Sequence, residues 1–254
     1  MRIILSNKMV FLVAILGISI SAVSVVMAWP SYIQYKNSDP KKDGFVQPRS
    51  VADLVRKTQL STVTIYCYDS KKTYGQGSGW ATDLEIEKDK DFGTAIVTNY
   101  HVLEDCINED GTLKKNSLKV TKLYGTKEWP AIIYDIDPEN DLAIILTSAS
   151  VKPLQMAPNI PLAGYWVMAV GTADGYEGSV AFGNVLNFND TEILITANIS
   201  HGNSGGPLID NEGKVIGTNT FSSKVEQYNG AKSLDAMCSV FIECNGDYYW
   251  EPEN

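Results

Sequence analysis

The sequence is poor in residues that bind metals. It has only two histidines, His101 and His201, and the spacings of its four cysteines fit no zinc-binding pattern. It also lacks a glycine-rich phosphate loop and the dinucleotide-binding fingerprint. We therefore expect no metal and no cofactor, so that any chemistry comes from the chain's own side chains and backbone.

Positive charge is also in short supply. The chain carries 21 Lys and Arg against 30 Asp and Glu, which gives a formal net charge of -9. Because nucleic acids are polyanions, we expect no nucleic-acid partner. Internal repeats are absent, whereas apolar residues make up 44% of the chain, enough for the core of a soluble globular protein.

Only the N-terminus has a long apolar run. Two basic side chains precede an uncharged run over residues 9–29. The run is about long enough for a helix that spans a bilayer, and Val26-Met27-Ala28 would also serve as a cleavage site. We interpret residues 1–29 as a signal anchor, slightly preferred, or a signal peptide, and residues 30–49 as the linker to an exported domain. An uncleaved anchor would make the membrane a partner of this segment.

Cysteine is scarce as well. The four copies are Cys67, Cys106, Cys238 and Cys244. They suit disulfide formation in an oxidising compartment, and four free buried thiols are the alternative. Four cysteines allow three complete pairings. A Cys238–Cys244 bond requires the helix predicted there to end early, because six residues of helix rise about 9 Å.

The rest of the chain has the pattern of short β-strands. From residue 61, apolar Val63, Ile65 and Cys67 alternate with polar residues, as in a half-buried strand. Further short strands fit residues 94–99, 117–124, 129–136, 142–147, 165–171, 179–188, 192–198, 206–210 and 214–221. Many short strands separated by turns predict an all-β fold made of two small barrels.

The domain boundaries follow from this pattern. Prolines near residues 153–161 indicate the crossing between the two barrels. We expect the N-terminal barrel over residues 50–152, and the C-terminal barrel with a C-terminal tail over residues 153–254. Short helices are predicted behind Ser50 and behind Ser233, each of which is a suitable N-cap.

One stretch combines a serine with residues that permit a tight backbone corner. Within residues 199–208, Ser204 follows Gly202 and Asn203 and precedes Gly205. The glycines tolerate dihedral angles that a β-carbon would resist. Such a corner exposes the hydroxyl and directs backbone N–H groups into one small space, where they can stabilise an oxyanion. The hydroxyl still needs a base, and the base an orienting group.

A histidine and an aspartate earlier in the chain can fill these roles. His101 follows one predicted strand, and Asp141 opens another. His, Asp and Ser in this order along the chain is one of the orders in which the hydrolytic triad occurs. Three other acids lie near Asp141 and compete for its role: Asp135, Asp137 and Glu139.

Together these motifs resemble those of the chymotrypsin-like serine proteases, and most closely the HtrA/Deg branch. The matching segments are Gly-Ser-Gly-Trp at 77–80, Val-Thr-Asn-Tyr-His-Val at 97–102, Asp-Leu-Ala at 141–143 and Gly-Asn-Ser-Gly-Gly-Pro-Leu at 202–208. The resemblance covers about residues 50 to 245, and we expect no C-terminal PDZ module. It implies a chymotrypsin-like fold, with two six-stranded antiparallel β-barrels and short N- and C-terminal helices.

The resemblance also implies the site. Ser204 would be the nucleophile, His101 the base and Asp141 its orienting group. The oxyanion hole would be formed by the N–H groups of Gly202 and Ser204, with Asn203 between them, and Cys67–Cys106 would be a disulfide. The walls of the substrate pocket would include Asn198, Ile199, Ser200, His201, Thr220 and Phe221.

The predicted pocket has no acid where one would mark a preference for basic side chains, so we expect an uncharged side chain there. We interpret His201 as a residue on the pocket rim; a second base or an ordinary exposed histidine are its alternatives. Thr220 is expected to bind substrate backbone and to support Asp141.

The predicted activity is that of a serine endopeptidase acting on protein or peptide substrates through an acyl-enzyme. HtrA relatives are often trimers, so an oligomer is implied by resemblance alone. Two alternatives remain open at this point. One is a catalytically silent binding or scaffold protein with the protease fold, and the other is an esterase that uses the same triad.

Overall fold

The computed structural model describes residues 43–68, 74–84, 91–158, 161–222, 228–238 and 241. The chain divides into two units, Met1–Asp43 and Gly44–Asn254, and the second contains both barrels. The interpretations of residues 1–29 and of most of the linker lie outside the described residues, as does Cys244. Among the described residues, no helix has the length and apolarity to cross a membrane.

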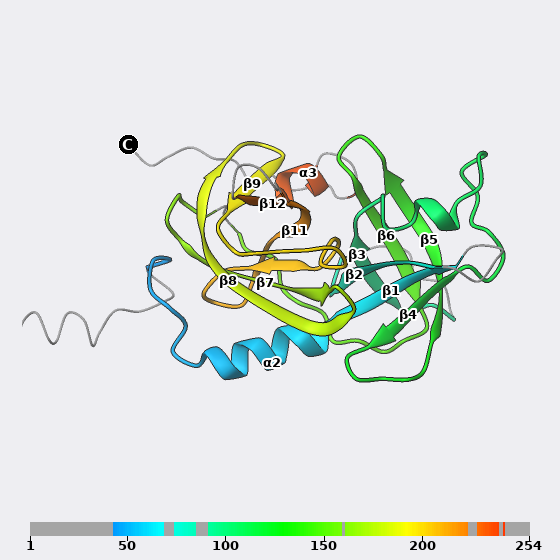
Figure 1. The fold of residues 1–254 in the computed structure, drawn as a ribbon, viewed down its shortest axis with the longest axis horizontal. Helices are drawn as coiled ribbons and strands as arrows, with labels where there is room; N and C mark the ends of the chain where they lie inside the picture. The colour runs from blue at the N-terminus through cyan, green and yellow to red at the C-terminus, as the bar shows by residue number, and fades with distance from the viewer. Residues whose placement is uncertain are drawn as a thin grey trace, which may run out of the picture. The chain divides into compact units, whose positions relative to one another are not determined.

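The first barrel is closed by six antiparallel strands in the order β1-β2-β3-β6-β5-β4 (Figure 1). Its interior is filled by β-branched and aliphatic side chains such as Val63, Ile65, Ile96, Val120 and Ile145, all fully buried or nearly so. The strands are β1 (Thr62–Tyr68), β2 (Tyr74–Thr82), β3 (Thr94–Thr98), β4 (Leu118–Lys122), β5 (Trp129–Asp137) and β6 (Leu142–Thr147).

The second barrel is also closed and antiparallel, in the order β10-β11-β12-β9-β8-β7 (Figure 1). Its core contains Val167, Ile193, Ile195, Leu208 and Ile216. The strands are β7 (Trp166–Ala173), β8 (Tyr176–Phe188), β9 (Glu192–Ile195), β10 (Pro207–Ile209), β11 (Val215–Ser222) and β12 (Asn229–Ser233). The prediction of two six-stranded antiparallel barrels is confirmed.

Strand β12 was missed by the sequence pattern. Its sequence, Asn-Gly-Ala-Lys-Ser, contains none of the β-branched or aromatic residues that favour strands. Neighbours on both sides hold it in place, because Gly230 pairs with Leu194 of β9 and with Phe221 of β11. Closure of the barrel, rather than local propensity, makes this segment a strand.

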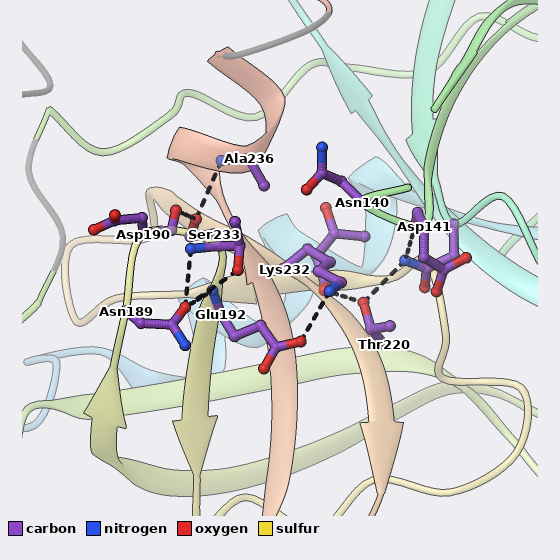
Figure 2. A network of polar contacts seen from close by, with 12 residues as sticks. Asn140, Asp141, Asn189, Asp190, Glu192, Thr220, Lys232, Ser233 and Ala236 are labelled. Carbon is purple, nitrogen blue, oxygen red and sulfur yellow. Dashed lines mark hydrogen bonds and ion pairs between the residues drawn. The ribbon is translucent and has the colours of Figure 1, made fainter. Parts of the chain in front are cut away.

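Two short helices flank the barrels as predicted, but only one has the predicted cap. Helix α2 (Val51–Ser61) begins after Ser50, yet the Ser50 hydroxyl makes no capping bond and instead donates to the Asp53 carboxylate at 2.5 Å. Helix α3 (Leu234–Cys238) begins after Ser233, whose hydroxyl accepts the Ala236 N–H at 3.2 Å (Figure 2). Ser233 is therefore a true N-cap.

A disulfide links Cys67 of β1 to Cys106, with 5.3 Å between the Cα atoms. Cys106 lies in a short 3-10 helix, η1 (Glu104–Cys106), that follows His101 closely. The predicted pair is confirmed. The bond fastens the segment behind His101 to the first strand of the barrel. The Cys238 side chain lies outside the described residues.

The two barrels pack against each other through a shared apolar cluster. Trp80 and Leu142 come from the first barrel, and Met168, Val170 and Ile209 come from the second. Leu54 of α2 and Leu234 and Met237 of α3 complete the same cluster. The Trp80 indole also donates a hydrogen bond to Thr218 Oγ1 of β11 at 3.1 Å. This packing brings the ends of strands from both barrels to one interface.

Candidate functional site

His101 and Asp141 meet because their strands are paired. Thr98 at the end of β3 pairs with Ala143 near the start of β6, so the residues just beyond these strands lie side by side. His101 Nδ1 lies 2.8 Å from Asp141 Oδ2, and the His101 N–H donates to Asp141 Oδ1 at 2.9 Å. Both oxygens of the Asp141 carboxylate thus bind His101. The other ring nitrogen, Nε2, is not used in these bonds.

Of the four acids that competed for this position, only Asp141 contacts His101. Asp137 accepts the N–H groups of Glu139 and Asn140 and shapes the turn before Asp141, and Asp135 accepts the N–H of Ile136. The Asp141 side chain is 24% exposed, so it is only partly buried. Its φ of 53° is a left-handed conformation that aspartate tolerates better than most residues.

A buried asparagine holds Asp141 from behind, and the sequence analysis gave it no role. Asn99 Nδ2 donates to the Asp141 carbonyl at 2.7 Å and to Thr220 Oγ1 at 2.9 Å, so it links the two barrels. Thr220 in turn donates to the Thr218 carbonyl at 2.9 Å. Thr220 therefore supports Asp141 through Asn99 and not through the carboxylate. The signal for Asn99 was its place in the Thr-Asn-Tyr-His motif.

Ser204 lies on the turn that precedes β10 in the second barrel. Gly202 and Gly205 have φ values of 91° and 86°, which a residue with a β-carbon adopts only at a cost. A β-carbon at Gly205 would lie 2.0 Å from the Ser78 carbonyl oxygen. The Ser204 hydroxyl donates to the Thr220 carbonyl at 3.2 Å. Among the described residues, no hydrogen bond joins it to His101.

Within residues 201–206, the N–H groups of Gly202 and Ser204, like that of His201, donate to no acceptor in the described part of the chain. The N–H groups of Asn203, Gly205 and Gly206 donate to the carbonyls of Ser200, Asn219 and Asn203. Gly202 and Ser204 are the two residues whose N–H groups are expected to form the oxyanion hole. The Asn203 N–H is used within the turn, so this residue lies between the two donors without adding a third.

The direction of the Gly202 N–H follows from its peptide plane. The Asp174 N–H donates to the His201 carbonyl at 2.7 Å, and every described peptide bond is trans. In a trans peptide the C=O and the next N–H point in opposite directions. The Gly202 N–H therefore points away from the Asp174 turn. The backbone of His201 is fixed while its side chain is exposed, and no hydrogen bond of the described residues joins its ring to Ser204.

The residues of the predicted substrate pocket have different environments. Asn198 is exposed, Ser200 and Thr220 are half-buried, and Ile199 is buried in the core cluster of the second barrel. Phe221 lies on β11, but its side chain is outside the described residues. In the part of the chain that the structure describes, no three His, Cys, Asp or Glu side chains are close enough together to hold a metal ion.

The arrangement is suited to hydrolysis by nucleophilic attack. It combines a hydroxyl on a tight turn, an imidazole oriented by a carboxylate, and two N–H donors beside the hydroxyl. A nucleophile, an oriented base and preorganised donors are the parts that acyl transfer requires.

Comparisons with known proteins agree with this assignment. Residues 77–217 match the family model described as the trypsin-like peptidase domain. A probable periplasmic serine endoprotease, DegP-like, of Chlamydia pneumoniae is 36% identical over 136 residues, 49% of this chain and 26% of that protein. Serine protease HTRA3 of Rattus norvegicus is 33% identical over 218 residues, 76% of this chain and 43% of that protein.

Protease Do-like 5, chloroplastic, of Arabidopsis thaliana is 29% identical over 192 residues, 66% of this chain and 59% of that protein. This chain therefore aligns with about a quarter to three-fifths of the length of these relatives. Among solved structures, the serine endoprotease from Yersinia pestis has a TM-score of 0.62 at 23% identity and covers 77% of this chain and 66% of its own. The active form of the Rv3671c protease from M. tuberculosis has a TM-score of 0.61 at 20% identity, with 76% and 86% covered.

Proposed function

This chain belongs to the trypsin-like peptidase domain family, and on that premise we propose that it is a serine endopeptidase of the HtrA/Deg type. Ser204 would attack the carbonyl carbon of a peptide bond, and His101 Nε2 would take the hydroxyl proton and pass it to the leaving amine. Water would then attack the acyl-enzyme, with His101 taking the proton of the water and returning a proton to Ser204. Asp141 would hold the imidazole and stabilise its charged form.

The observation that carries the proposal is the pair of N–H groups at Gly202 and Ser204, which have no acceptor among the described residues. A tetrahedral intermediate develops negative charge on its carbonyl oxygen, and two preorganised donors stabilise that charge. A silent scaffold has no need to keep both donors available. The bond from the Asp174 N–H to the His201 carbonyl supports the same reading, because it keeps that carbonyl out of the space required by the oxyanion.

Catalysis would require one local change at Ser204. Its hydroxyl donates to the Thr220 carbonyl, and it would have to exchange that bond for one to His101 Nε2. Hydrogen bonds of this kind commonly tighten only when substrate binds.

The proposed substrates are proteins or peptides cut after an uncharged side chain, because Asn198 provides no acid that would select lysine or arginine. We also propose that the protein is exported. The Cys67–Cys106 disulfide is typical of oxidising compartments, and the names of two related chlamydial proteins describe them as periplasmic.

The test is labelling of the full chain with a fluorophosphonate probe, which reacts with activated serines. Wild type and Ser150→Ala, which changes an exposed serine in another part of the chain, should label, whereas Ser204→Ala and His101→Ala should not. Absence of labelling in folded wild type would contradict the proposal and favour the scaffold. Peptide and ester substrates assayed side by side then separate the endopeptidase from an esterase.

A further inference from the structure

Ser78 is a fully buried serine of the first barrel that faces the catalytic turn of the second. It lies on β2 within the Gly-Ser-Gly motif and pairs with Thr64 of β1. Its hydroxyl donates to the Gly202 carbonyl at 2.6 Å and accepts the Thr172 N–H at 2.9 Å. Its own N–H donates to the Ser204 carbonyl at 2.8 Å. One residue therefore binds both ends of the segment from Gly202 to Ser204.

The carbonyls of this turn are held alternately by the two barrels. The carbonyls of His201 and Asn203 accept the N–H groups of Asp174 and Gly206, which belong to the second barrel. The carbonyls of Gly202 and Ser204 accept the hydroxyl and the N–H of Ser78. Because each peptide is planar, these bonds fix four successive planes. Two of the four planes depend on Ser78.

The peptide between Gly202 and Asn203 depends most on hydrogen bonds from outside the turn for its orientation. Gly202 has a φ of 91° and no side chain, so its own torsions do not restrict the peptide that follows it. The Thr172 N–H reaches the Gly202 carbonyl at 3.4 Å, a longer distance than that from the Ser78 hydroxyl. The hydroxyl thus makes the shortest of the bonds on the Gly202–Asn203 peptide, which lies between the two oxyanion donors and whose N–H donates to the Ser200 carbonyl at 3.1 Å.

We propose that Ser78 is a positioning residue for the oxyanion hole, acting from the first barrel on a turn of the second. The inference rests on the proposed function. The hydroxyl touches no reacting atom; it sets the angle between the Gly202 and Ser204 N–H groups by holding the peptide between them. The backbone N–H of Ser78 holds the Ser204 peptide in the same way and survives substitution of the side chain.

Replacing the hydroxyl separates this role from simple stability. Ser78→Ala should lower kcat about ten- to hundred-fold and change KM less than about twofold, since a loosened donor is less damaging than a deleted one. The matched control is Ser117→Ala. Ser117 is also buried in the first barrel and its hydroxyl donates to the carbonyls of Cys106 and Lys114, away from the site. Both variants should lose a similar amount of thermal stability, but only Ser78→Ala should lose kcat.

A direct measurement of the oxyanion hole completes the test. A peptide trifluoromethyl ketone forms a hemiketal with the nucleophilic serine, and its ¹⁹F NMR shift reports the pKa of the hemiketal hydroxyl. Wild type and Ser117→Ala should keep this group ionised to lower pH, whereas Ser78→Ala should raise its pKa by about one to two units. If Ser78→Ala does not fold, Ser78→Cys, with a weaker donor of similar shape, should show a smaller shift in the same direction.

The outcomes are distinguishable. A wild type that forms no hemiketal and takes no fluorophosphonate overturns the proposed function, and this inference with it. A wild type that reacts, together with a Ser78→Ala variant that has unchanged kcat and an unchanged hemiketal pKa, overturns the role of Ser78 alone.

Discussion

The two barrels position their proposed catalytic residues in different ways. The first barrel holds His101 and Asp141 just beyond the ends of two paired strands, and both bonds between them lie within that barrel. The second barrel carries Ser204 on a turn before β10, and two of the carbonyls of that turn are bound by Ser78 of the first barrel. The geometry at His101, the proposed base, is therefore local, whereas the geometry at Ser204, the proposed nucleophile, depends on how the two barrels pack against each other.

The largest expected effect breaks the local pair of the first barrel. Asp141→Asn should lower kcat by about 10⁴, because an amide favours the wrong tautomer of His101 and cannot stabilise its charged form. Asp135→Asn is the matched control, since Asp135 is an exposed neighbour whose carboxylate accepts only a local N–H. Steady-state kinetics on a peptide substrate measure both. Equal activities of the two variants would show that Asp141 is not the residue that orients His101 for catalysis.

Two buried asparagines, one in each barrel, sharpen the comparison. Asn99 Nδ2 donates to Asp141 and Thr220, and Asn219 Nδ2 donates to the carbonyls of Val170 and Pro207 within the second barrel. Asn99→Ala and Asn219→Ala should each cost about 1–3 kcal/mol of unfolding free energy, because buried acceptors lose their donors. Denaturant titration measures this cost.

Kinetics should separate the same two variants. Asn99→Ala should also lower kcat about tenfold, because it releases the backbone of Asp141, which has a φ of 53°. Asn219→Ala should lose less kcat at the same residual stability. The reverse order would show that support for Asp141 does not come from Asn99.

The smallest expected effect concerns a carboxylate in α3, after the last strand of the second barrel. Burial, and to a lesser degree the charge of Asp190, raise the pKa of Asp235. A raised folded-state pKa means that ionisation costs stability once the pH rises above the unfolded pKa near 3.8. Asp235→Asn should therefore raise the free energy of unfolding at pH 7 by less than about 0.5 kcal/mol, and the Tm slightly with it, since the group is only partly buried and solvent screens its charge. The gain should vanish below about pH 4, and a Tm series between pH 3 and pH 7 tests it.

The fold and the pairing of His101 with Asp141 could be predicted from the sequence for a physical reason. Alternation in β1 and the apolar run of β6 mark strands whatever their partners, and His101 and Asp141 lie directly beside such strands. Strand β12 was not accessible, because neighbouring strands and not its own residues make it extended. The prediction that Ser50 caps the first helix was wrong, because its hydroxyl donates to the Asp53 carboxylate instead of accepting a backbone N–H.

The residues that support the site could not be predicted from the sequence, for a related reason. Ser78 and Asn99 both lie in recognised motifs, but their partners are 124 and 121 residues away along the chain, in the other barrel. Spacing along the chain carries no information on such contacts. The N–H groups of Gly202 and Ser204 were expected as oxyanion donors by resemblance only. That they lack acceptors among the described residues follows only from the hydrogen bonds of the turn in the structure.

The alternation of bonds in the turn also affects how the protein matures during synthesis. Domains fold from the N-terminus as the chain is made, so the first barrel can close once residue 147 has emerged. Ser204 is translated later, and the Gly205 N–H has its acceptor only when Asn219 of β11 is in place. A nascent chain can therefore close the first barrel before the turn that carries Ser204 is fixed, so the proposed hydrolytic site forms only once β11 has joined the second barrel.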